Sequence, residues 1–123
     1  MIASGSKSFS PSVFGFKGEE HCITSDDIFA MEELPKSMVI IGGGYIGTEM
    51  AGIMAAFGVK VTLLVRDILL ARVDQEIVDL LIENMKKHHI DVRLMANSNE
   101  VTKNPQTGML NVHLEDGSQI QTE

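Results

Sequence analysis

The chain has 123 residues, of which 44% are hydrophobic and 22% charged, and its formal net charge is −7. This size and composition are typical of one compact domain with a single core. The basic residues are few and dispersed, which argues against a nucleic-acid partner. No apolar run is long enough to cross a bilayer and the first residues lack a signal-peptide pattern, so we expect no membrane partner and a cytoplasmic or organellar location.

The first third of the chain predicts little regular structure. Residues 6–22 mix Ser, Pro, Gly and Phe without periodicity, which indicates a connecting loop. Thr24, with Asp27 three residues later, is a pattern that caps helices. We therefore expect a short helix over residues 25–32, ended by Pro35.

The most informative segment joins an apolar run to a series of glycines. Residues 38–41 are uniformly apolar, as in a buried parallel strand, and Gly42, Gly44 and Gly47 follow with Gly-x-Gly-x-x-Gly spacing. In a dinucleotide site the first glycine permits a tight turn, the second lets the pyrophosphate approach, and the third lets the helix pack closely. The alternative is a glycine turn that merely joins a strand to a helix.

The residues after the glycines favour the dinucleotide interpretation. Met50 and Met54 supply bulk beside a face of small residues, Gly58 can end the helix, and residues 59–65 form a second apolar run. The small residues of that face are Gly47, Ala51 and Ala55. Together these segments predict a strand–helix–strand unit of about thirty residues whose helix N-terminus favours phosphate.

The end of the second strand indicates which nucleotide is preferred. Val65 stands where a carboxylate would bind the ribose hydroxyls of NAD, and Arg66 and Arg72 follow it. Arginine fits the 2′-phosphate of NADPH, so we expect NADPH to be favoured over NADH. Asp67 leaves two alternatives open, because it can pair with Arg66 as a solvated surface couple or act as a displaced ribose acceptor.

The remaining segments complete an α/β pattern. Asp74 can cap a helix over residues 75–88, in which Ile77, Leu81 and Met85 form an apolar stripe beside Val78 and Ile82. The adjacent His88 and His89 do not share a helix face, so we expect no metal site. Further strands follow. Residues 91–95 predict a third parallel strand, and residues 100–103, 109–114 and 119–121 predict an antiparallel meander. The expected fold is a Rossmann-like three-layer domain with a central parallel sheet and an antiparallel β-meander.

These motifs resemble the FAD-dependent pyridine nucleotide-disulfide oxidoreductases, and most closely glutathione reductase or the larger type of thioredoxin reductase. The resemblance covers most of the chain. The matching segments are, in order, Ile2–Gly5, Ile23–Phe29, Glu33–Pro35, Gly42–Gly47 with Glu49, Ala51 and Gly52, and Val65–Arg66 with Asp74. It implies that residues 1–5 are a remnant of the FAD-domain boundary, residues 6–34 a connecting segment, and residues 35–123 an NAD(P)H-binding domain truncated at its C-terminal end.

The resemblance also implies roles for residues near the glycines. An aromatic residue at the position of Tyr45 covers the flavin, and an acid at the position of Glu49 lies near the flavin and nicotinamide. Ile46 belongs to the same expected cofactor site. Judged from the residues alone, Tyr45 can simply pack with its hydroxyl in water, and Glu49 can simply complement the helix dipole.

Three positions depart from the family pattern. Ala71 stands where thioredoxin reductases carry a second arginine, and Arg72 comes one residue later. Glutathione reductases often have alanine in place of Gly47. Dihydrolipoamide dehydrogenases have glutamate in place of Val65, which argues against that NAD-linked branch.

The chain lacks parts that the family's reaction needs. It has one cysteine, Cys22, and therefore no redox cysteine pair; no acid/base histidine segment or flavin fingerprint is present either. We expect an excised domain or partial gene product that is not catalytic alone. Its partners would be the missing FAD and dimerisation domains of a homodimeric parent enzyme, which passes hydride from NADPH to FAD and on to a disulfide. The alternatives are a thioredoxin reductase, an NADH oxidase or another NAD(P)H-dependent flavin enzyme, and a non-catalytic nucleotide-binding module.

Overall fold

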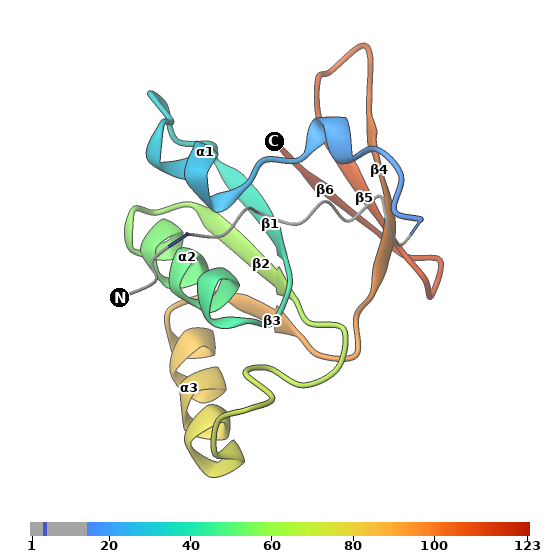
Figure 1. Ribbon diagram of the computed structural model, residues 1–123. Coiled ribbons are helices and arrows are strands. Elements are labelled where there is room, and N and C mark those ends of the chain that lie inside the picture. The colour runs from blue at the N-terminus through green and yellow to red at the C-terminus, as the bar shows by residue number, and fades with distance from the viewer. Residues whose placement is uncertain (1–3, 5–14) are drawn as a thin grey trace.

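A computed structural model describes residue 4 and residues 15–123 of the chain (Figure 1). The matching segment Ile2–Gly5 and the predicted loop over residues 6–22 therefore lie mostly outside the described residues. The described end of that loop contains a short 3-10 helix, η2 (Glu19–His21). Among the helices that the structure describes, none has the length and apolar composition that crossing a membrane requires.

Three parallel strands form the centre of the domain. They are β1 (Ser37–Ile41), β2 (Lys60–Leu64) and β3 (Asp91–Arg93), in the order β1-β2-β3. Met38 of β1 is paired with Val61 of β2, and Leu63 of β2 with Val92 of β3. This sheet confirms the predicted strand–helix–strand unit and the third parallel strand. The carboxyl ends of all three strands consequently lie at one edge.

Two helices cover one side of this sheet. They are α2 (Tyr45–Ala56) and α3 (Gln75–Lys87), and Figure 1 shows α2 to the left of β1 and β2, with α3 below it. Ala51 of α2 and Leu63 of β2 are completely buried in the core between the layers. Gly58 ends α2 as predicted, since its φ of 86° lets the amide of Val59 donate to the Met54 carbonyl (3.1 Å).

The apolar stripe of α3 differs from the prediction. The helix begins after Asp74 as expected, and the Asp74 carboxylate accepts a hydrogen bond from the Glu76 amide at 3.0 Å. The buried residues of α3 are Val78, Ile82 and Met85, with Leu81 partly buried beside them. Ile77, which the prediction included in the apolar stripe, is 61% exposed and does not belong to the buried face. Rotation of the helix by one position brings Val78 rather than Ile77 onto the sheet.

An antiparallel meander covers the other side of the parallel sheet. It contains β4 (Ser98–Lys103), β5 (Leu110–Leu114) and β6 (Gln119–Thr122), and no strand end differs from its prediction by more than two residues. Leu64 of β2 packs with Val101, Val112 and Leu114 in a second apolar cluster. The domain therefore has three layers, and the predicted Rossmann-like fold with a β-meander is confirmed.

Two predicted elements are shorter in the structure. Helix α1 (Ser25–Phe29) begins with Asp27 accepting hydrogen bonds from the Thr24 amide and hydroxyl, both at 2.7 Å, which lower the pKa of Asp27. It stops before residue 32 because the Ala30 amide bonds back only three residues, to Asp27. Strand β3 ends at Arg93 rather than Met95, since Met95 has a left-handed φ of 55°.

The end of the meander is tied to the start of the parallel sheet. The Ser37 hydroxyl receives hydrogen bonds from the Thr122 hydroxyl and the Glu123 amide, both at 3.2 Å. The Lys36 amide donates to the Glu123 carboxylate at 2.6 Å. These contacts bring β6 against the first residues of β1.

Candidate functional site

The glycine turn leaves β1 at the carboxyl edge of the parallel sheet. Gly42 has a φ of 129°, a conformation that residues with a side chain rarely adopt, and its amide donates to the Leu64 carbonyl at 2.9 Å. The Gly43 carbonyl accepts a hydrogen bond from the Leu70 amide at 2.8 Å. These bonds hold the turn between β2 and the loop that follows it.

Each fingerprint glycine has a separate structural reason. Gly44 faces open space, with no heavy atom within 4 Å of where a Cβ would stand. A Cβ on Gly47 would overlap the carbonyl oxygen of Gly42 and would lie 3.4 Å from Cγ2 of Ile40. Gly44 thus leaves room for a ligand, and Gly47 allows α2 to lie against the turn, as the spacing predicts.

The first turn of α2 is suited to an anion. Gly44 is the N-cap residue, and no side chain caps the helix and no acidic residue stands in its first turn. The first intrahelical bond is donated by the Thr48 amide to the Gly44 carbonyl, so the amides of Tyr45, Ile46 and Gly47 precede the helical ladder. The positive end of the helix dipole adds to their attraction for phosphate.

The side chains of this turn point outward. Tyr45 is 72% exposed and Ile46 is 45% exposed, and Glu49 one turn later is also exposed. Exposed aromatic and aliphatic side chains next to an anion site leave an apolar surface for a flat ring to contact. The expected cofactor roles of Tyr45, Ile46 and Glu49 remain predictions.

A cleft of about 360 Å³ joins the glycine turn to the end of β2. It brings together Gly42, Gly43 and Arg66, which the sequence places in two separate segments. Val65 is buried, and its carbonyl accepts a hydrogen bond from the Ala96 amide at 2.9 Å. The buried valine therefore holds Arg66, the next residue, at the exposed rim.

Asp67 forms an ion pair with Arg66. Its carboxylate lies 3.8 Å from Nε of Arg66, and the two side chains are 78% (Arg66) and 68% (Asp67) exposed. The sequence left two alternatives open for Asp67, a surface ion pair with Arg66 and a displaced acceptor for the ribose. The structure contains the ion pair, which does not exclude the second role. Arg72 does not line either of the two clefts described here, so its assignment to the 2′-phosphate also remains a prediction.

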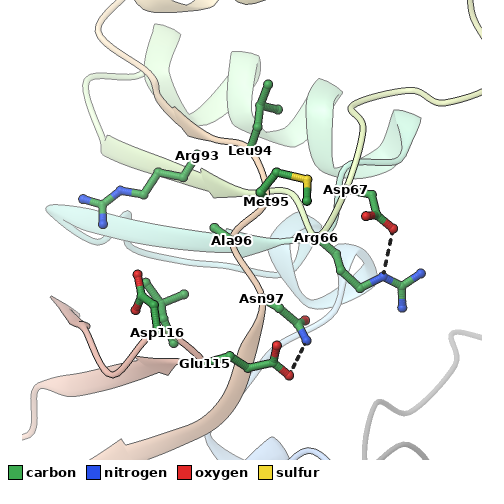
Figure 2. Close-up of a pocket in the computed structure, with 10 residues that line it drawn as sticks. Arg66, Asp67, Arg93, Leu94, Met95, Ala96, Asn97, Glu115 and Asp116 are labelled. Carbon is green, nitrogen blue, oxygen red and sulfur yellow. Dashed lines mark hydrogen bonds and ion pairs between the residues drawn. The ribbon is translucent and has the colours of Figure 1, made fainter.

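A second cleft of about 490 Å³ extends from Arg66 to the turn between β5 and β6 (Figure 2). Sequence reasoning missed its other polar residues, which are Arg93, Asn97, Glu115 and Asp116. The Asn97 side chain donates to the Glu115 carboxylate at 2.7 Å, and this bond joins the segment between β3 and β4 to the turn between β5 and β6. The one available signal was that ligands in parallel sheets bind beyond the carboxyl ends of strands, where residues 94–97 lie.

Cys22 lies outside this site. It is a free, exposed thiol, and its pKa is raised by partial burial and by the nearby carboxylates of Glu19 and Glu20. A thiol with a raised pKa is a weaker nucleophile near neutral pH than an ordinary cysteine.

The three layers and the glycine turn define the chain as a Rossmann-like α/β domain in which the glycine turn leads into the N-terminus of a helix. Residues 1–123 match the pyridine nucleotide-disulphide oxidoreductase family, and the chain belongs to that family. The predicted resemblance is therefore confirmed, and the family is enzymatic and uses flavin and pyridine nucleotide.

Individual relatives agree with this membership. Trypanothione reductase of Leishmania donovani is 38% identical in a match that covers 97% of this chain and 24% of that protein. The HOCl-induced flavoprotein disulfide reductase RclA of Escherichia coli superimposes with a TM-score of 0.70 at 32% identity, over 77% of this chain and 21% of that one. A ferredoxin reductase from Rhodopseudomonas palustris gives a TM-score of 0.66 at 25% identity, over 72% of this chain and 22% of that one. The chain thus spans about a quarter of the trypanothione reductase and about a fifth of the two solved structures.

Proposed function

We propose that this chain is the NADPH-binding domain of a flavoprotein disulfide reductase similar to glutathione reductase. The observation that carries the proposal is the cleft in which the glycine turn and Arg66 meet. A helix N-terminus attracts a pyrophosphate, and an arginine at the end of the second strand attracts a 2′-phosphate. The two groups are parts of one molecule of NADPH.

Each predicted residue has a place in this arrangement. Gly42, Gly44 and Gly47 receive the pyrophosphate, because the turn leaves backbone amides free and Gly44 leaves the approach open. Arg66 binds the 2′-phosphate, with Arg72 as a second candidate. Tyr45, Ile46 and Glu49 form the exposed surface towards the nicotinamide and the flavin.

For the parent enzyme we propose the reaction of a flavoprotein disulfide reductase, which the family membership supports. When bound, NADPH supplies a hydride to FAD, and the electrons pass on to a disulfide. In this chain the residues bind and orient the nucleotide, while FAD, the redox cysteines and the acid/base histidine belong to other domains of a homodimeric parent. We therefore propose that residues 35–123 are the nucleotide-binding unit, that residues 6–34 connect it to the FAD domain, with residues 1–5 a remnant of that domain's boundary, and that the chain is not catalytic alone.

The substrate and the nucleotide have alternatives. The identity to trypanothione reductase supports a disulfide substrate of low molecular weight. A thioredoxin reductase or an NADH oxidase is the second candidate, and a nucleotide-binding module without redox chemistry is the third. A flavoprotein disulfide reductase is favoured over the third because RclA, itself named as one, is 32% identical.

Calorimetric titration with NADPH and NADH tests the nucleotide site. The variant Arg66→Ala should bind NADPH about ten- to a hundredfold more weakly, with little change for NADH, because only NADPH carries the phosphate. Arg93→Ala is the matched control, since Arg93 also lines the larger cleft but bonds to Asp91 at 2.8 Å. Equal effects of the two variants, or no binding of either nucleotide to the folded chain, would contradict the proposal.

A further inference from the structure

Arg66 does not stand alone at the rim of the cleft. Its nearest charged neighbour is Asp67, whose carboxylate lies 3.8 Å from the guanidinium Nε. Asp67 lines both clefts, so its carboxylate is positioned beside the same space as Arg66. Figure 2 shows the pair at the rim, with the dashed contact between the two side chains. A ligand group that reaches Arg66 must therefore also approach Asp67.

The other charges of the larger cleft do not offset this carboxylate. Arg93 extends to the opposite side in Figure 2 and bonds to Asp91. Glu115 and Asp116 add two further carboxylates, so the cleft is lined by two basic and three acidic side chains. A site built to select a dianionic phosphate would be expected to have an excess of positive charge.

Asp67 affects the two nucleotides in opposite directions. A 2′-phosphate at Arg66 binds a guanidinium that is already paired with a carboxylate through Nε, and it remains close to that like charge. A ribose with a free 2′-hydroxyl has no such charge, and a carboxylate near the end of the second strand can accept its hydrogen bond.

We propose that Asp67 is a specificity-determining residue that weakens the preference for NADPH set by Arg66, so that the domain binds NADH as well. This inference rests on the proposed nucleotide site. The arginine attracts the phosphate, and the adjacent aspartate reduces the difference between the two nucleotides. The domain is then one of mixed specificity rather than one restricted to NADPH.

The test is calorimetric titration of Asp67→Asn with NADPH and with NADH, at low and moderate salt. The ratio of the NADH to the NADPH dissociation constant should rise roughly tenfold, as expected when one unit charge is removed near a dianion. The increase should be smaller at moderate salt, because the groups are exposed and screened. Asp91→Asn is the matched control, since it removes an aspartate from the other Arg–Asp pair, outside both clefts.

The outcomes separate this inference from the proposed function. If Asp67→Asn leaves the ratio unchanged, or changes it no more than Asp91→Asn does, while Arg66→Ala still lowers NADPH affinity, the inference is overturned and the nucleotide site stands. If the folded wild-type chain binds neither nucleotide, the proposed function itself fails. Circular dichroism of each variant establishes that the comparison is made between folded proteins.

Discussion

The closest steric constraint in the candidate site is at Gly47, and it gives a prediction for stability. In Gly47→Ala the new Cβ would overlap the carbonyl oxygen of Gly42, and that oxygen belongs to the backbone of the glycine turn. The overlap can be relieved only by moving the helix or the turn. Adding a group to a well-packed position typically costs about 1–3 kcal/mol.

The matched control is Gly52→Ala in the same helix. Both positions are helical glycines, so each substitution gains up to about 1 kcal/mol of helix propensity. A Cβ on Gly52 would have no heavy atom within 4 Å and therefore adds no steric cost. The difference in unfolding free energy between the two variants should consequently equal the overlap cost, about 1–3 kcal/mol, with Gly47→Ala the less stable.

Urea unfolding monitored by circular dichroism measures this difference. Gly52→Ala should unfold at a higher urea midpoint than the wild-type chain, and Gly47→Ala at a lower midpoint than Gly52→Ala, without a change in m-value. Equal midpoints for the two variants would refute the argument that Gly47 is required for close packing.

Two predictions concern ionisable groups elsewhere in the domain. Hydrogen bonds from the Ser118 hydroxyl and amide lower the pKa of Asp116. The ionised carboxylate therefore stabilises the folded chain above the ordinary aspartate pKa of about 3.9. This stabilisation is lost as the pH falls through the folded pKa. In urea titrations from pH 6 to pH 2, the wild-type chain should therefore lose more stability than Asp116→Asn, and equal losses would show that Asp116 is not linked to folding. Because burial and then Glu19 and Glu20 raise the pKa of Cys22, the native thiol should react with iodoacetamide more slowly at pH 8 than the urea-unfolded thiol; equal rates would contradict the assigned shift.

The local patterns of the sequence predict the glycine turn and its neighbours well. Gly42 and Gly58 have positive φ angles, which glycine adopts readily and other residues rarely do. A turn at each of these positions can therefore be predicted from the glycine itself, without knowledge of the rest of the fold. The caps formed by Asp27 and Asp74 are equally local, because each contacts a residue two or three positions away. Such features need only short segments of the chain to specify them.

The orientation of α3 could not be read from its sequence. Its apolar residues cover more than half of the helix surface, and Ile77 and Leu80 belong to the set as much as Val78 does. Which part of that surface is buried depends on how the helix meets the sheet, and Ile77 and Leu80 are exposed in the structure. Because the apolar surface of α3 is wider than the face that packs on the sheet, the sequence does not determine the rotation of the helix about its axis to within one residue.

The acidic side of the larger cleft was also beyond sequence reasoning. Asn97 and Glu115 are hydrogen-bonded although 18 residues separate them, and the contact exists only because the meander turns back onto the parallel sheet. Neither residue belongs to a recognisable motif. Their proximity to Arg66 is a product of tertiary structure, whereas Arg66 itself was identified from its place after the second strand.

The hydrogen bonds between Ser37 and the end of β6 have a consequence for the order of folding. Ser37 and Thr122 are 85 residues apart, whereas Ser37 is paired within the parallel sheet with the much nearer Lys60. Closing the longer loop costs about 1 kcal/mol more in chain entropy than closing the shorter one. During synthesis on the ribosome, β1, β2 and the helix between them can associate long before β6 has emerged. The contact at Ser37 thus forms after the parallel unit, because it requires β6.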